Sequence, residues 1–286
     1  MKLNPASFES DRWPIGVADE KMLYSKNWKE SACNIKRQGC YAWMCDQVDN
    51  LKPRKILEMG CGTGESTEAL FRHFGAPIIS IEENPDCIKR AGNLLQKHGF
   101  DSEGIYRIEY RQFENNRHCL IPSQRLISTS KHVSLVQGDI LVDDPELLRF
   151  IESQAPYDLI TVWLIGTFMM RKSCVNLDGM RCQSPREYSL RVQNRMYEIA
   201  HRMLTPGGIL QVVDRGEPPQ TEDLLQAVFL SHRDQASVTD LCVRKVTWKV
   251  YKEVDGKRGI SLVDSKLGRK SNEMAVVSII SEKPKA

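Results

Sequence analysis

The feature that most constrains this chain is a short apolar run that leads into three closely spaced glycines, residues 55–64, KILEMGCGTG. The apolar residues predict a buried strand, and Ser66 or Thr67 can cap a helix that continues to residue 74. Glycine allows a sharp turn and a close approach of the backbone to a ligand, and the helix N-terminus offers unpaired N–H groups. The stretch therefore predicts a strand, a nucleotide-type binding turn and a helix.

The spacing of these glycines narrows the class of ligand. Glycine stands at positions 60, 62 and 64, whereas the dinucleotide fingerprint G-x-G-x-x-G would need its third glycine at position 65, which is Glu65. A carboxylate in this turn is unfavourable for a pyrophosphate but harmless to a ligand without phosphate. The chain has no G-x-x-x-x-G-K-[S/T] sequence, so a P-loop for ATP or GTP is not expected. An NAD-dependent oxidoreductase remains an alternative.

A second strand and a carboxylate follow at the separation that such a site needs. Residues 77–81 are apolar and β-branched and lead into Glu82 and Glu83, after which Asn84 can cap a helix that begins at Pro85. In Rossmann-like sites, an acidic residue about 20 positions beyond the glycines meets the ribose hydroxyls. Strand, glycine turn, helix, strand and carboxylate in this order predict an open α/β sheet with its site at the strand ends.

Three further segments carry a family resemblance, QGDI at 137–140, YDLI at 157–160 and LTPGG at 204–208. Together with LEMGCGTG at 57–64 they resemble the motifs of the class I S-adenosylmethionine (SAM)-dependent methyltransferases, over about residues 50–282. The resemblance implies an α/β fold, a doubly wound, mostly parallel seven-stranded sheet with an antiparallel last strand. Residues 243–250 and 274–280 fit the antiparallel pair that closes such a sheet.

The resemblance also assigns roles to individual positions. Glu58 would orient the amino group of SAM, and the register of the family's pattern selects Glu82 over Glu83 for the ribose hydroxyls. Asp139 would contact the adenine amino group. The full set of positions expected at the cofactor is Glu58, Gly60, Cys61, Gly62, Gly64, Glu82, Glu83, Asp139, Ile140 and Trp163.

The rest of the chain is expected to extend this core. Residues 1–50 predict an N-terminal helical extension or lid, with loop over 1–26 and an amphipathic helix over 27–48. Residues 51–286 would form the core. It carries insertions near 101–131, where weak alternation favours a hairpin, and near 253–272, where lysine, arginine and glycine favour a surface loop.

Composition excludes several other classes of protein. A net charge of +3 is too small to imply nucleic-acid binding by itself. The longest apolar run, residues 159–170, is too short to span a bilayer, and no secretory signal is evident. The nine cysteines are odd in number and lack C-x-x-C pairs, which favours reduced thiols in a cytoplasmic compartment and predicts no metal site.

The methyl acceptor is less constrained than the cofactor. An aromatic N-terminal segment ahead of a complete core favours a lid over a small-molecule acceptor, methylated on O, N or C. The positions expected near the acceptor are Trp13, Trp28, Asp214 and Arg215. An RNA or protein methyltransferase, which would use the basic stretch 257–270 and the arginines of 107–125, and a non-catalytic SAM-binding scaffold remain alternatives. The sequence assigns no catalytic base.

Overall fold

An eight-stranded sheet forms the centre of the computed structural model, which describes residues 8–10, 16–114, 116–123, 129, 131–180, 182, 184–253, 262–263, 270–271 and 273–285. The strands lie in the order β10 (Cys242–Lys252), β13 (Glu273–Glu282), β9 (Leu204–Gly216), β8 (Tyr157–Trp163), β2 (Ile56–Met59), β3 (Ile78–Glu82), β7 (Val133–Gln137) and β4 (Ser102–Ile105). Within this sheet β13 runs antiparallel to both of its neighbours, and the other pairings are parallel. The expected mostly parallel sheet with a reversed last strand is thereby confirmed.

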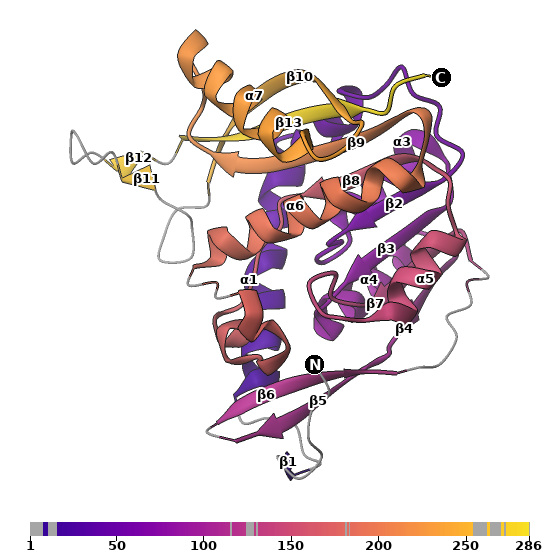
Figure 1. The fold of residues 1–286 in the computed structure, drawn as a ribbon, viewed down its shortest axis with the longest axis vertical. Helices are drawn as coiled ribbons and strands as arrows, with labels where there is room; N and C mark the ends of the chain where they lie inside the picture. The colour runs from indigo at the N-terminus through magenta and orange to yellow at the C-terminus, as the bar shows by residue number, and fades with distance from the viewer. Residues whose placement is uncertain are drawn as a thin grey trace.

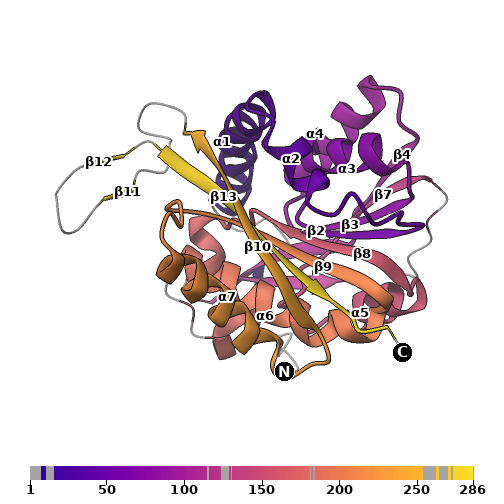
Figure 2. The same ribbon diagram turned by 90° about the horizontal axis from the view of Figure 1, so that it is seen from above.

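The central strands are buried on both faces. Every residue of β2, β3, β7 and β8 is buried, as expected for parallel strands that helices cover on both sides. Helices α5 (Pro145–Ser153), α6 (Pro185–Met203) and α7 (Glu222–Ala236) lie on one face, and α2 (Cys40–Asp46), α3 (Glu65–Phe74) and α4 (Pro85–Lys97) lie on the other (Figure 2). The two apolar layers between sheet and helices form the core.

Helix α1 (Val17–Arg37) differs from the predicted helix over 27–48. It begins ten residues earlier, within the segment expected to be loop, and ends where Gly39 adopts a φ of 67°. Because a left-handed residue cannot continue a helix, the chain breaks there and restarts as α2. Helix α1 is not packed flat on a face of the sheet but stands beside the carboxyl ends of the strands (Figure 1).

The segment expected as an insertion contributes to two sheets. Strand β4 pairs with β7 and adds an eighth strand to the predicted seven. Strands β5 (Ile108–Phe113) and β6 (Arg117–Pro122) form the expected antiparallel hairpin, and β1 (Phe8–Ser10) pairs with β5. The 3₁₀ segments η2 (Met169–Ser173) and η3 (Val175–Met180) follow β8, and the short strands β11 (Leu262–Val263) and β12 (Lys270–Ser271) pair with each other.

Helix α3 begins at Glu65 after Gly64 and has no side-chain cap, so the expectation that Ser66 or Thr67 caps it is wrong. Side chains do cap the starts of α4, α5 and α6, and the cap of α4 is the one that the sequence predicts. Asn84 accepts a hydrogen bond from the Asp86 N–H at 3.0 Å, and Asp144 accepts one from the Leu147 N–H at 3.1 Å. The cap of α6 is Ser184, and each of these three caps precedes a proline at the first helical position. No helix within the described residues is both long and apolar enough to cross a bilayer.

The burial of β2 predicts the effect of a cavity at its centre. Leu57 of β2 is fully buried under the layer formed by α5, α6 and α7. Leu57→Ala is therefore expected to lower the free energy of unfolding by about 2–5 kcal/mol. The matched control is Leu224→Ala on α7, where the side chain is 46% exposed and the expected change is within about 0.5 kcal/mol. Urea denaturation measures both, and equal losses would contradict the assignment of Leu57 to the core.

Candidate cofactor-binding site

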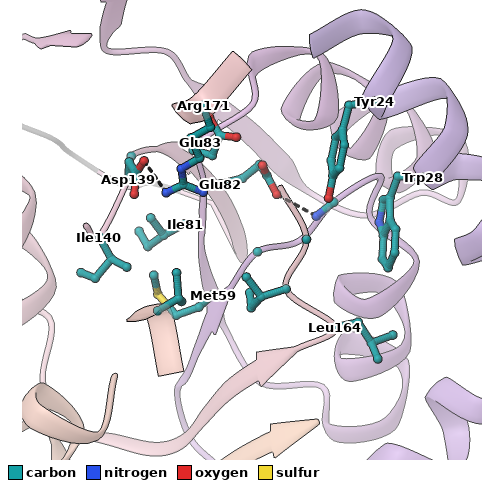
Figure 3. Close-up of a pocket in the computed structure, with 16 residues that line it drawn as sticks. Tyr24, Trp28, Met59, Ile81, Glu82, Glu83, Asp139, Ile140, Leu164 and Arg171 are labelled. Atoms are coloured by element: carbon teal, nitrogen blue, oxygen red, sulfur yellow. Dashed lines mark hydrogen bonds and ion pairs between the residues drawn. The ribbon is translucent and has the colours of Figure 1, made fainter. Parts of the chain in front are cut away.

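A cavity opens at the carboxyl edge of the sheet, between the ends of β2, β3, β7 and β8 and the helix α1 (Figure 3). The empty space between its lining atoms, part of which is open solvent, amounts to about 570 Å³. Its lining residues are Tyr24, Trp28, Met59, Gly60, Gly62, Ile81, Glu82, Glu83, Gly138, Asp139, Ile140, Leu164, Ile165, Gly166, Arg171 and Val192.

The glycine turn between β2 and α3 forms one wall of this cavity. Gly60, Gly62 and Gly64 all have positive φ, at 80°, 51° and 96°, a backbone conformation that other residues rarely adopt. The Gly60 N–H donates to the Ile81 carbonyl at 2.7 Å, which joins the turn to the end of β3. The turn is therefore held by the backbone, and its glycines are required by conformation.

Glu82 links the glycine turn to the start of α4. Its carboxylate accepts hydrogen bonds from the Gly62 N–H and the Asn84 N–H, both at 2.9 Å. Burial and the neighbouring Glu83 carboxylate raise the pKa of Glu82 to about 7 despite these two donors. The side chain lines the cavity and is 8% exposed, so it presents a carboxylate whose charge changes near neutral pH.

Glu83 points toward a different partner. Its carboxylate lies 2.6 Å from the ammonium of Lys21, a fully buried lysine on α1 that also lies over the rings of Tyr110 and Phe168. Burial alone would raise the pKa of Glu83, but Lys21 and Arg171 outweigh it and lower the pKa below its usual value. Glu83 is therefore an ionised partner of α1, whereas Glu82 faces the glycine turn.

Asp139 follows β7 and is paired inside the cavity. One carboxylate oxygen accepts from the Leu141 N–H at 3.0 Å, and the other lies 2.6 Å from Nη2 of Arg171. Arg171 belongs to η2, and its guanidinium also lies over the ring of Tyr188. Both members of the pair are buried and line the cavity (Figure 3).

Two aromatic side chains of α1 cover the cavity. The side chains of Tyr24 and Trp28 project from one face of the helix toward the glycine turn and the loop after β8 (Figure 3). A Cβ atom at Gly62 would collide with the indole of Trp28, and one at Gly166 would collide with the hydroxyl of Tyr24. Burial raises the pKa of the Tyr24 hydroxyl, so this group remains a protonated donor.

The structure separates the positions that the sequence assigned to the cofactor. Those that line the cavity are Gly60, Gly62, Glu82, Glu83, Asp139 and Ile140. Glu58, Cys61, Gly64 and Trp163 do not line it. Glu58 is fully buried and accepts hydrogen bonds from the hydroxyls of Ser66 and Thr67, both at 2.6 Å, so it braces the start of α3.

Trp163, the last residue of β8, packs against α2 and does not line the cavity. Its ring stacks on Tyr41 of α2 with centroids 6.5 Å apart, and its indole N–H donates to Gln211 at 3.2 Å. Because successive strand residues point to opposite faces, the last residue of β8 turns away from the site. The lining is made instead by the next three residues, and the first of them, Leu164, has a φ of 54°.

The positions expected at the acceptor are divided as well. Trp28 lines the cavity. The guanidinium of Arg215 lies 5.2 Å from the ring centroid of Trp28 and also pairs with the carboxylate of Glu253. Asp214 accepts a hydrogen bond from Gln193 at 2.8 Å and does not line the cavity. Trp13 lies outside the described residues. Among those that are described, no group of three histidine, cysteine, aspartate or glutamate side chains could hold a metal ion.

Sequence reasoning missed two of the cavity's polar side chains as site residues. Tyr24 belongs to the aromatic N-terminal segment that is expected as a lid, but it is not among the positions assigned to the site. It stands four residues before Trp28, so a helix that begins at residue 17 places both on one face, and local patterns do not predict that helix start. No local sequence pattern indicates Arg171 as a site residue, because its partner Asp139 lies 32 positions earlier, outside η2. Long-range ion pairs of this kind are invisible in local patterns.

The raised pKa of Glu82 predicts a pH dependence of stability. A carboxyl group with a pKa of about 7 when folded and 4.5 as a reference binds its proton more tightly in the folded state. The free energy of unfolding should therefore fall by about 1–3 kcal/mol between pH 5 and pH 8 from this group. Glu82→Gln cannot titrate and should lose that component, as measured by urea denaturation at each pH. Parallel pH profiles for the wild type and the variant would contradict the shift.

The sequence similarity of this chain to known proteins is low. No model of a known protein family matches the sequence. A segment of 68 residues is 29% identical to the chloroplastic tocopherol O-methyltransferase of Arabidopsis thaliana, covering 24% of this chain and 20% of that enzyme. The match thus spans a fifth of that relative's length.

The solved structures that match the chain do so at low sequence identity and low TM-score. The N-methyltransferase NodS from Bradyrhizobium japonicum WM9, crystallised with S-adenosyl-L-homocysteine, is 12% identical with a TM-score of 0.44 and coverage of 87% of each chain. TehB from Haemophilus influenzae is 12% identical with a TM-score of 0.43, covering 85% of this chain and 62% of that one. Such values are too low to transfer an activity. By its own motifs and its sheet with a reversed last strand, the chain resembles the class I SAM-dependent methyltransferases in sequence pattern and in fold.

Proposed function

We propose that this chain is a SAM-dependent methyltransferase that acts on a small molecule. The observation that carries the proposal is that one cavity gathers the glycine turn, the carboxylate of Glu82 and the carboxylate of Asp139. These groups come from the ends of three parallel strands, β2, β3 and β7, which lie side by side in the sheet. Ligands of open α/β sheets bind at this edge.

The residues present fit the parts of SAM. Glu82 would accept hydrogen bonds from the two ribose hydroxyls, and the apolar side chains of Ile81 and Ile140 would flank the adenine ring. Asp139 would accept from the adenine amino group. The glycine turn, which carries no side chain beyond Cys61 and Thr63, would border the methionine part.

The charge at the start of α3 argues against a dinucleotide. Glu65 occupies the first position of α3, where a pyrophosphate would need the helix N-terminus. Its carboxylate is paired with Lys29 of α1 and accepts a hydrogen bond from Thr63 at 2.6 Å. A buried, paired carboxylate at this point supports a ligand without phosphate over NAD.

Bound SAM supplies a methyl group on a positively charged sulfonium, which an acceptor attacks in line. The chain's contribution would be to align the two reactants and to exclude water, and no covalent intermediate with the protein is needed. Tyr24 and Trp28 cover the cavity from α1, as a lid would. No proton acceptor is assigned.

The covering of the cavity supports a small-molecule acceptor. Apart from the carboxylates and Arg171, the lining is glycine, apolar or aromatic, and Trp28 and Tyr24 cover the cavity. An RNA methyltransferase would need a basic surface that tracks phosphates. The basic stretch 257–270, on which that alternative rests, lies largely outside the described residues.

Calorimetry with SAM and with S-adenosyl-L-homocysteine tests the proposed cofactor. The folded wild type should bind both ligands. Glu82→Gln should weaken binding by about 1–3 kcal/mol because the ribose hydroxyls lose a charged acceptor. Glu83→Gln is the matched control and should change affinity much less, since that carboxylate is engaged by Lys21.

Binding of NAD with no binding of SAM would replace the proposal by the oxidoreductase alternative. Equal effects of the two glutamine variants would show that the ribose is not held by Glu82. Circular dichroism of each variant ensures that a loss of affinity is not a loss of folding.

The acceptor class can be tested without knowing the acceptor. The protein is incubated with SAM carrying a tritiated methyl group and with a cell extract, and the label is separated by acid precipitation. The label should appear in acid-soluble compounds that chromatography separates from SAM itself, because the covered cavity favours small acceptors, and excess S-adenosyl-L-homocysteine should suppress it. Label confined to precipitable material that ribonuclease or protease releases would refute the small-molecule acceptor.

A further inference from the structure

A series of buried charges of alternating sign closes one end of the cavity. Lys21 of α1 pairs with Glu83 after β3, and Arg171 of η2 pairs with Asp139 after β7, each at 2.6 Å. Glu83 and Arg171 also interact electrostatically, which joins the two pairs. All four side chains are at most 16% exposed. Because buried charges are costly unless paired, the series is stable only while each member keeps its partner.

Arg171 differs from an ordinary structural arginine in its position. Its guanidinium lines the cavity beside Asp139 and Ile140, on the side where the base of a nucleoside ligand would lie. Nη2 is committed to Asp139, and one face lies over the ring of Tyr188. Among the described residues, the buried Nε–H has no hydrogen-bond partner. The guanidinium of Arg171 therefore faces the cavity in an orientation that its contacts with Asp139 and Tyr188 fix.

We propose that Arg171 is a positioning residue that selects the base of the nucleoside ligand by fixing the carboxylate of Asp139 as a hydrogen-bond acceptor, through the contact of 2.6 Å between the two side chains. The inference rests on the proposed function. An ionised carboxylate can only accept hydrogen bonds, whereas a protonated one can also donate. With Arg171 in place, the cavity favours a base with an exocyclic amino group and disfavours one with a carbonyl oxygen at that position.

The chemistry of the base gives the sign of the effect. Adenine turns an N–H donor toward an acceptor such as Asp139, but hypoxanthine would turn a carbonyl oxygen toward it, leaving two acceptors face to face. Sites built around such polar groups discriminate strongly, because the wrong ligand leaves buried groups unpaired. Without the guanidinium, Asp139 loses the contact that fixes its orientation and its role as an acceptor, so the preference against a carbonyl oxygen should weaken.

The test compares two ligands by calorimetry, S-adenosyl-L-homocysteine and S-inosyl-L-homocysteine, which carries hypoxanthine. The wild type should prefer the adenine ligand by at least about tenfold, in line with the loss of one buried hydrogen bond to a charged group. Arg171→Met should reduce this preference at least about fivefold, and Arg171→Lys, which keeps the cation, should restore part of it.

Arg107→Met provides the control for a merely structural effect. Arg107 and Asp144 form an equally buried arginine–aspartate pair, but neither side chain lines the cavity. This variant should lower stability and leave the preference between the two ligands unchanged. An Arg171→Met protein that folds and keeps the wild-type preference would overturn the inference. A wild type that binds neither ligand would instead remove the proposed function, and the inference with it.

Discussion

The carboxylate of Glu82 is the constraint on which the site depends. It ties the glycine turn after β2 to the first turn of α4 by accepting the N–H groups of Gly62 and Asn84. A second carboxylate, Glu83, stands beside it, and burial together with this neighbour raises the pKa of Glu82 to about 7. Two adjacent buried carboxylates are tolerated because basic side chains from distant parts of the chain lie beside them. Lys21 arrives on α1 and Arg171 on η2. The negative charge at the end of β3 therefore explains why α1 and η2 each place a basic side chain there.

Local signals explain most of what the sequence predicted correctly. Apolar runs followed by glycine or by an asparagine–proline or aspartate–proline pair predicted β2, β3 and the starts of α4 and α5. The reversed strand was predicted because an alternating run and a second apolar run follow the last motif. The helical extent of residues 17–26 was not predicted, since the nearby proline and glycine favoured a loop. The pairs Lys21–Glu83 and Arg171–Asp139 join residues 62 and 32 positions apart, and no local pattern carries such information.

Glu58 is held by neighbouring side chains of the protein and does not line the cavity. The motif places an acidic residue at the end of the first strand, and the resemblance implies that it faces the ligand. In this chain two hydroxyls follow on α3, and Ser66 and Thr67 each donate to one of its oxygens. Burial raises the pKa of Glu58, and these two donors work against that shift. The carboxylate is satisfied without a ligand, so its evident task is to hold the strand end against the helix start.

The glycines of the cavity have a second reason to be glycines. Gly62 is expected to let a ligand approach the backbone, yet a side chain there would also collide with Trp28, and one at Gly166 would collide with Tyr24. The two positions follow neighbouring strands, Gly62 after β2 and Gly166 after β8, and α1 reaches both through aromatic residues four positions apart. Helix α1 is held in this place by ion pairs to Glu83, Glu65 and Glu68. Gly62, which is expected to admit a ligand, is thus also a position that admits an aromatic side chain of α1. A larger residue at either glycine would disturb the covering helix before it met any ligand.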